Sequence, residues 1–333
     1  MGFDTNFSFD SSEDGIAEMS FSTLANYVAQ CASIALTIHN SPLLLQGILN
    51  LEKPYWESFV RNVFANIGSS STYFDAAKRG VLCQREYLDP FEVELGILFS
   101  QAHKQVKVWQ SGNDRLIRSI FLYVPLSLGA GYELSFRNSI SGNFNMEILR
   151  DAASEFIESS MPDDVVRVIE LLFTLDVSDR DMISLANAQI AQAIEDFQKA
   201  DMSLLDFFKM ASMQNLIYEE LSNSFEIIFG KGIKAFEEAY SESEDLVQSI
   251  GHTYLSLLSE FKDSYLMATD RSDLARRVQV QAKDAIANGG LLTEDGREST
   301  NALIRSLVGH TPRAIEALTT AVTFIAILAG VRP

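Results

Sequence analysis

The feature that most limits the fold of this chain is the spacing of its apolar residues, which repeats every three or four positions from residue 20 onward. Within residues 106–132, six apolar side chains fall on one side of a helix: Leu116, Ile117, Ile120, Phe121, Val124 and Leu128. Nowhere do apolar and polar residues alternate between turn signals, as a half-buried strand requires. Only seven prolines and 18 glycines interrupt the chain. The sequence therefore predicts an all-α protein.

The same periodicity predicts how the chain is divided. Residues 1–19 are rich in Asp, Ser and Glu without helical spacing, so we expect a disordered acidic tail. Residues 20–333 contain no linker and no internal repeat, which favours a single domain of roughly a dozen helices. Besides the central helix that follows Asp114, helices are predicted at 21–40, 55–68, 72–83, 90–110, 146–159, 163–173, 179–196, 204–229, 234–240, 243–267, 272–288, 299–308 and 312–328.

Helix breakers set several of these boundaries. Pro42 disfavours helical geometry at Ser41, so the first helix should stop there. Gly68 and the three serines after it are expected to end the second helix. Pro125 lies inside the central apolar run, where a proline kinks a helix or forces it to restart. Residues 138–145 are polar and predict a loop.

The net charge of −19 argues against nucleic acid as a partner, because phosphate neutralisation needs clustered Lys and Arg. Cys31 and Cys83 stand far apart, so neither a zinc site nor a disulfide framework is indicated. The longest apolar run, 321–331, is too short to span a bilayer, and the first 15 residues are acidic rather than signal-like. We therefore expect a cytoplasmic protein that is not inserted in a membrane. A protein partner or a homo-oligomer remains open.

A first candidate ligand site lies at the start of the central helix. Asn113 or Asp114 can accept hydrogen bonds from the unpaired N–H groups of that first turn. Arg115 and Arg118 follow about one turn apart, at the end of a helix where the dipole favours anions. One interpretation is a site for a small anionic ligand. The other is an ordinary capped helix of the core.

The usual phosphate, zinc and acyl-transfer motifs are absent, and the four histidines have no ligand spacing. His39 and His310 are the better candidates, because each lies at a helix–loop junction near a proline. Asp263, followed by Ser264 and Tyr265, stands near the end of a strongly apolar helix. A carboxylate there either holds Mg²⁺ with a phosphate or ends the helix.

Several landmarks recur in the order found in one known family. An AQCASIAL helix precedes Ser41–Pro42, Gly112 precedes IFLYVPL, and Asp263–Ser264 precedes the last helix, TPRAIEALTTAVTFIAILAG. From about residue 22 to 331 the chain thus resembles the triphosphoribosyl-dephospho-CoA synthase family, whose last helix is similar to NPGTTADLTAAALFLALLAG. The resemblance implies a helical enzyme that transfers a triphosphoribosyl group from ATP to 3′-dephospho-CoA, releases adenine and uses Mg²⁺.

The departures from that family fall on its polar motifs. Leu43–Gln46 replaces Lys-Pro-Gly-Asn after Ser41–Pro42, and 112–118 replaces a Gly-Thr-Asn-Thr-Asn-Leu-Gly loop. Residues 162–166 replace a Pro-Gly-Gly-Leu-Gly turn, while Asn215 and Ala317 replace aspartates. The lost residues include glycines that let backbone approach phosphates and acids that bind metal. The apolar scaffold matches, whereas most polar site residues differ.

Two functional interpretations follow. In the first, the chain is a diverged transferase that binds a nucleotide- or CoA-like substrate, with Mg²⁺ arriving alongside ATP. In the second, it is a non-catalytic binding or interaction protein on the same scaffold. The candidate ligand- and phosphate-binding residues are Ser41, Asn113, Asp114, Arg115, Arg118, Ser264, Tyr265 and His310, and the candidate metal ligand is Asp263. If Asp114, Arg115 and Asp263 converge on one pocket, the first interpretation is favoured.

Overall fold

Helices are the only regular elements in the part of the chain that the computed structural model describes. That part comprises residues 19–37, 56–109, 114, 116–175, 199–212, 215–268, 271–307 and 310–332. The all-α prediction is confirmed. No helix among these residues is long and apolar enough to cross a membrane. The predicted tail lies outside the description except for Met19, whose backbone N–H donates to Asn138 Oδ1 at 2.7 Å.

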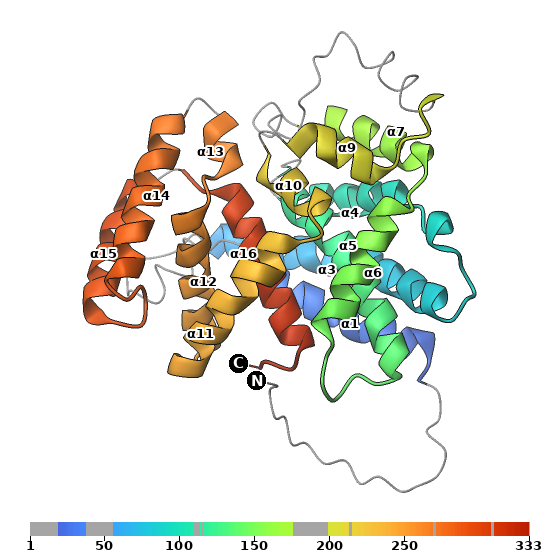
Figure 1. Cartoon of the computed structure of the whole chain (residues 1–333), viewed down its shortest axis with the longest axis horizontal. Helices are drawn as coiled ribbons and strands as arrows, with labels where there is room; N and C mark the ends of the chain where they lie inside the picture. Colours follow the sequence, from blue (N-terminus) through green and yellow to red (C-terminus); the bar gives the residue numbers. More distant parts are fainter. Residues whose placement is uncertain are drawn as a thin grey trace, which may run out of the picture.

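The first group of helices occupies one side of Figure 1. Its members are α1 (Phe21–Thr37), α3 (Trp56–Gln84), η1 (Pro90–Glu92), α4 (Leu95–Trp109), α5 (Ile117–Arg137), α6 (Met146–Glu158), α7 (Pro162–Phe173), α9 (Leu204–Ala211) and α10 (Leu216–Ser222). The second group follows as η5 (Ile227–Gly232, π-helical), α11 (Ile233–Ser243), α12 (Leu246–Glu260), α13 (Ser264–Ala268), α14 (Ser272–Ala287), α15 (Glu294–Ser306) and α16 (Arg313–Leu328).

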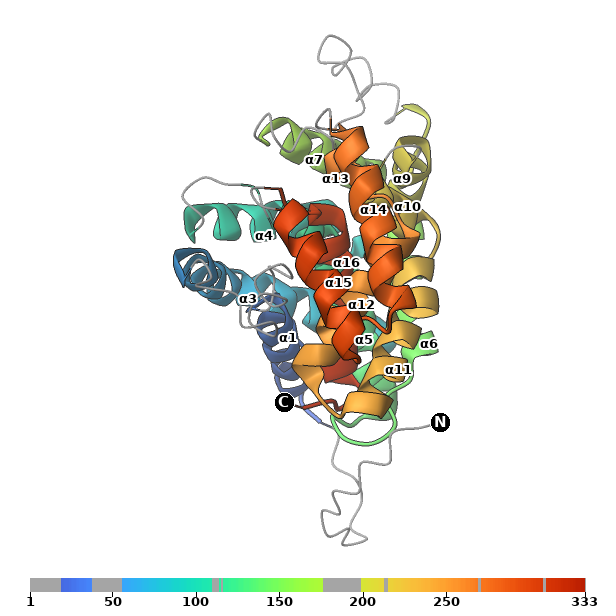
Figure 2. The same ribbon diagram turned by 90° about the vertical axis from the view of Figure 1, so that its left-hand side faces the viewer.

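The last helix, α16, joins the two groups, because it packs against α1 and α5 on one side and against α12 and α13 on the other (Figures 1 and 2). Residues 314–328 of α16 are all buried, as expected for a helix whose side chains beyond its first turn are apolar apart from three threonines. The buried apolar side chains of the described residues form one cluster that extends from Leu24 to Val331. The polar start of α16 is therefore held in the middle of the molecule.

The central helix α5 is buried along most of its length and crosses α3 closely. A Cβ atom on Gly131 would lie 2.0 Å from the carbonyl oxygen of Ala77, and one on Gly80 would lie 2.0 Å from that of Leu128. Glycine is thus needed on both helices for this backbone approach. Pro125 lies inside α5 without restarting it, because packing on all sides outweighs the one hydrogen bond that proline removes.

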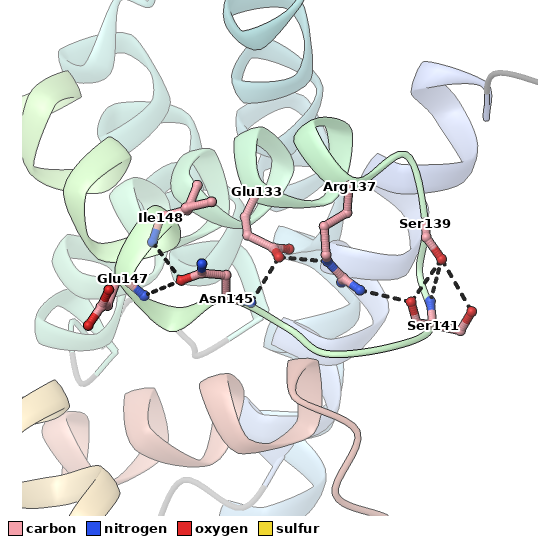
Figure 3. A network of polar contacts seen from close by, with 7 residues as sticks. All are labelled: Glu133, Arg137, Ser139, Ser141, Asn145, Glu147 and Ile148. Atoms are coloured by element: carbon pink, nitrogen blue, oxygen red, sulfur yellow. Dashed lines mark hydrogen bonds and ion pairs between the residues drawn. The ribbon is translucent and has the colours of Figure 1, made fainter. Parts of the chain in front are cut away.

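The far end of α5 is tied to α6 by a buried carboxylate (Figure 3). Glu133 Oε1 accepts from Arg137 Nε at 2.6 Å and from the backbone N–H of Asn145 at 2.9 Å. Asn145 in turn caps α6, since its side-chain oxygen accepts from the N–H groups of Glu147 and Ile148. Burial raises the pKa of Glu133, although the Asn145 N–H and the Arg137 guanidinium oppose the rise. The predicted polar loop 138–145 thus closes one end of α5.

The prediction that Gly68 and the serines after it end a helix is wrong. α3 continues from Trp56 to Gln84 through this stretch. Ser69 and Thr72 are buried, and the Thr72 hydroxyl donates to Gln105 Oε1 on α4 at 2.7 Å. Packing against α1, α4 and α5 therefore overrides the weak helix propensity of glycine and serine.

Three long predicted helices are broken in the structure. The span 90–110 is divided into η1 and α4, and Glu94 between them has a φ of 54°. The span 204–229 is divided at Asn215, which caps α10, and at Ser224 and Phe225, which have φ of 53° and 58°. The span 243–267 is divided after Glu260, and Asp263 starts a separate short helix. Periodicity did not reveal these breaks, because the apolar spacing continues across them. The predicted helix 299–308 begins earlier, at a Thr293 cap, and 179–196 lies outside the described residues.

Candidate functional site

Two arginines and one tyrosine bring three helix starts together. Arg118 belongs to the first turn of α5, Tyr265 to α13, and Arg313 is the first residue of α16. The guanidinium carbon of Arg118 lies 4.9 Å from the centroid of the Tyr265 ring, and that of Arg313 lies 4.2 Å from it. A cation over an aromatic face is stabilised by about 0.5–2 kcal/mol, depending on desolvation. We call the following set the Tyr265 cluster: Tyr265 and the two arginines over its ring, Asp263 and Ser264 directly before it in the chain, and Tyr254 and Glu316, since Tyr254 interacts electrostatically with Glu316 and Asp263.

Asp263 joins two of these helix starts through its carboxylate. Oδ2 accepts from the backbone N–H groups of Ala314 at 2.8 Å and Ile315 at 3.0 Å, at the beginning of α16. Oδ1 accepts from the N–H of Leu266 at 3.0 Å, in α13. A carboxylate on unpaired N–H groups of a first turn is a strong cap. The structure thus gives Asp263 a structural role different from the helix end that the sequence suggested: it caps the starts of α13 and α16, whereas α12 already ends at Glu260.

Burial dominates the electrostatics of the cluster. Asp263 is 1% exposed, and burial raises its pKa to about 6, although three backbone N–H groups and the Arg118 guanidinium lower it. Glu316 is fully buried in the first turn of α16. Burial, and then the nearby carboxylates of Glu316 and Asp263, raise the pKa of Tyr254 well above its usual value. The cluster thus holds two guanidinium groups, two carboxyl groups and two phenols, of which that of Tyr254 has the raised pKa.

Two hydroxyl groups of the cluster have unused hydrogen-bonding capacity. Tyr254 Oη and Ser264 Oγ are buried, and neither has a hydrogen-bond partner among the residues that the structure describes. Buried polar atoms usually have a partner in the protein, in ordered water or in a ligand. Arg313 and His310 are only half-buried, whereas Arg118 is 1% exposed. The cluster therefore extends from the protein interior toward its surface.

Asp114 lies in a different set of contacts. Its Oδ1 lies 2.6 Å from His103 Nε2 and 3.2 Å from Lys107 Nζ, both on α4. Lys107 also donates to the carbonyl oxygen of Thr174, after α7, at 3.1 Å. The residue at the cap position of α5 is Leu116, which makes no side-chain cap hydrogen bond. Asp114 therefore connects α4 to the start of α5.

The structure places the other predicted site residues as follows. Arg118, Asp263, Ser264 and Tyr265 belong to the Tyr265 cluster, as shown above. His310 lies three residues before α16, with its backbone N–H on the carbonyl oxygen of Leu307 at 2.8 Å. Ser41, Asn113 and Arg115 lie outside the described residues. Because Arg115 lies outside the described residues, the predicted convergence of Asp114, Arg115 and Asp263 stays a prediction.

Sequence reasoning missed Tyr254, Arg313 and Glu316. Glu316 had a usable signal, because it is the last charged residue before Arg332 and stands in an otherwise apolar helix. A carboxylate in such a position is costly to bury unless it has partners. It also directly precedes Ala317, where the related family has an aspartate. Arg313 and Tyr254 had no comparable signal, because only the packing of α12 and α16 brings Arg313 to Tyr265 and Tyr254 to Glu316 and Asp263.

The residues present do not form a metal cage of their own. Within the described ranges, no group of three or more His, Cys, Asp and Glu side chains could hold a metal ion. Mg²⁺, however, is usually bound by one or two carboxylates together with substrate phosphates. The cluster offers Asp263, whose oxygens already accept three N–H groups, and Glu316. These two carboxylates fit a magnesium ion carried on nucleotide phosphates.

Comparison with known proteins gives a consistent assignment. The model of a family described as ATP:dephospho-CoA triphosphoribosyl transferase matches residues 57–329. A crystal structure from Archaeoglobus fulgidus, described as a triphosphoribosyl-dephospho-CoA synthase, has 21% sequence identity and a TM-score of 0.57. The match covers 84% of this chain and 100% of that one. No curated protein matches the chain. At this identity the structural match establishes the fold alone.

Proposed function

Since this chain belongs to the ATP:dephospho-CoA triphosphoribosyl transferase family, we propose that it binds a phosphorylated nucleotide- or CoA-like molecule at the Tyr265 cluster. The observation that carries the proposal is the pair of guanidinium groups 4.9 and 4.2 Å from one tyrosine ring. Arginine binds phosphate oxygens through two parallel N–H donors, and the starts of α5 and α16 add a favourable dipole. Tyr254 Oη and Ser264 Oγ offer further polar contacts to such a ligand.

The roles within this site follow from burial. Arg313 is half-buried and would meet the ligand phosphates first, whereas Arg118 balances the charge of Asp263 from inside. Glu316 would hold Mg²⁺ that arrives with ATP, and the ion would neutralise phosphate charge there. Asp263 acts as a positioning residue, because it anchors α13 and α16 and so fixes Tyr265 beside Arg313.

We further propose that triphosphoribosyl transfer itself is weak or lost. Three positions where the related family has a site residue have structural roles here. Asp164 is buried and accepts from the N–H groups of Gly96 and Met161, Asn215 caps α10, and Ala317 is fully buried in α16. Electrostatic positioning carries most of the catalysis in phosphate chemistry, so losing such residues together is costly.

Ligand-induced stabilisation tests the binding proposal. Thermal unfolding is measured with ATP, dephospho-CoA and CoA, each with and without Mg²⁺. A ligand at a hundred times its Kd stabilises the folded state by about 2.7 kcal/mol and so raises Tm. Arg313→Ala should abolish that shift with little effect on the free protein, because this side chain is half-buried. Arg305→Ala, an exposed change on α15, is the matched control.

Arg118→Ala is a poor probe of binding, because Arg118 is 1% exposed and its loss leaves Asp263 buried without its neighbouring cation. If no phosphorylated compound shifts the wild type, or if Arg313→Ala keeps the full shift, the Tyr265 cluster is not the site.

The second candidate function is a non-catalytic binding protein, favoured by the structural roles of Asp164 and Asn215. The two candidates separate in an assay of adenine release from ATP in the presence of dephospho-CoA and Mg²⁺. We expect little or no adenine. Turnover on the order of 1 per second, typical of ordinary enzymes, would establish an active transferase instead.

A further inference from the structure

Two adjacent described segments of this acidic protein, α1 and residues 63–74 of α3, carry no charged side chain. None of the 17 residues of α1 is Asp, Glu, Lys, Arg or His, and neither is any residue from 63 to 74 in α3. Charged residues make up 21% of the chain, so these segments depart clearly from the rest. The side chains of α1 that point to solvent are Ser22, Thr23, Asn26, Gln30 and Ile34. We call the surface of these two segments the uncharged α1–α3 face.

A groove of about 750 Å³ lies between the two helices of this face. Serine and amide side chains line it together with Ile34, Ile67 and Phe74. Ile34 is 50% exposed and Ile67 is 63% exposed, so apolar side chains protrude beside the groove. The face therefore offers both a depression and apolar side chains of a size to enter one.

The apolar part continues onto the neighbouring helix α4. Phe64 stacks on Trp109 with ring centroids 5.6 Å apart, and both residues are 48% exposed. Figure 2 shows α1, α3 and α4 together along one side of the molecule. Exposed large apolar side chains that gather at one place mark interaction surfaces, whereas single ones are ordinary. Four such residues from three helices meet here.

We propose that the uncharged α1–α3 face is the surface on which a second copy of this chain docks. Two copies, each of net charge −19, repel one another, and they approach at least cost where neither presents charge. A two-fold axis through the face would place the protruding Ile67 of each copy against the groove of the other. Elsewhere an exposed apolar residue such as Val280, 52% exposed, has charged neighbours, Arg276, Arg277, Lys283 and Asp284, on its own helix.

Sedimentation velocity of the full chain over a range of concentrations tests this proposal. The wild type should reach twice the 37.0 kDa mass of one chain. Ile67→Glu should raise the dimer Kd on the order of 10²-fold, because it buries a charge at the centre of the interface. Gln30→Glu, on α1, should also raise the dimer Kd. Val280→Glu is the matched control and should leave the Kd unchanged.

The salt dependence of the dimer Kd tests the proposal independently. Between about 0.1 M and about 1 M salt the Debye length falls from about 10 Å to about 3 Å, so repulsion between the two acidic copies is screened. Dimerisation through an uncharged face should therefore strengthen. A wild type that stays monomeric, a Kd that Ile67→Glu and Val280→Glu change equally, or a dimer that salt dissociates would overturn the proposal. Circular dichroism and Tm verify that each variant is folded.

Discussion

Asp263→Asn should change how the stability of the protein depends on pH. The folded-state pKa of Asp263 is about 6, compared with an ordinary value of 3.8, because burial disfavours the ionised form. A group with a raised pKa binds more protons in the folded state between these two values. The folded wild type is therefore most stabilised by this group below about pH 4, and loses that stabilisation as pH rises through 6. A shift of about 2 pKa units corresponds to about 3 kcal/mol.

The substitution also removes one hydrogen bond. The amide oxygen of the substituted side chain would still accept hydrogen bonds from the N–H groups of Ala314 and Ile315. Its NH₂ group, however, would face the N–H of Leu266, which donates to Asp263 Oδ1 at 3.0 Å in the wild type. Leaving one buried N–H unsatisfied costs about 1–3 kcal/mol. At about pH 4 the wild type should therefore be the more stable protein. Near pH 7 the two effects are similar in size, so the two proteins should have nearly equal stability.

Urea unfolding of both proteins at a series of pH values measures this directly. The difference in unfolding free energy, wild type minus variant, should fall by about 3 kcal/mol between about pH 4 and pH 7. Other titrating groups are common to both proteins and cancel in the difference. A difference that is constant or increases with pH would refute the reasoning, because Asp263 would then not be ionising in a buried site.

Three further predictions rest on other contacts. Glu220 is fully buried, its carboxylate accepts from the N–H groups of Ile227 and Ile228, and burial raises its pKa to about 8. Compared with Glu220→Gln, the wild type should therefore lose about 1.4 kcal/mol of unfolding free energy per pH unit between about pH 5 and 8, and urea unfolding at several pH values measures this loss. Gly131→Ala should destabilise the folded protein by about 1–3 kcal/mol or more, because the added Cβ forces α3 and α5 apart. Ser70→Ala, at a half-buried position of α3, is the control and should leave the stability nearly unchanged in thermal unfolding. Tyr265→Phe should keep the ligand-induced rise in Tm, whereas Tyr265→Leu should lose it, because only the aromatic face positions the two guanidinium groups.

The fold class and the family were accessible from the sequence for a simple reason. Apolar spacing is a local property, and it indicates a helix wherever about three turns agree, as in α5 and α16. Helix ends that depend on one local signal were also predicted well, such as the start of α7 at Pro162 and the polar loop after α5. The order of landmarks along the chain led to the family that the comparison then confirmed.

Boundaries that depend on packing were not accessible in this way. The glycine and serines after Ile67 predict a helix end, yet α3 continues, because packing against α1, α4 and α5 buries Ser69 and Thr72. The apolar spacing through 204–229 reads as one helix, yet Asn215, Ser224 and Phe225 divide it. A local signal is worth about 1 kcal/mol per residue, and burial of several side chains exceeds it.

The candidate site likewise combines positions set by local sequence patterns with contacts set by tertiary packing. The sequence by itself indicated that Arg118 lies at the start of a buried helix and that Asp263, Ser264 and Tyr265 stand near the end of a strongly apolar one, since these positions depend on local patterns. Only the tertiary structure decided that Asp263 caps α16, 51 residues further along the chain, and that Arg313 and Arg118 both lie over Tyr265. The reason is that these contacts arise where α16 packs between the two groups of helices, and the partner of a side chain across such an interface leaves no periodic trace in either segment.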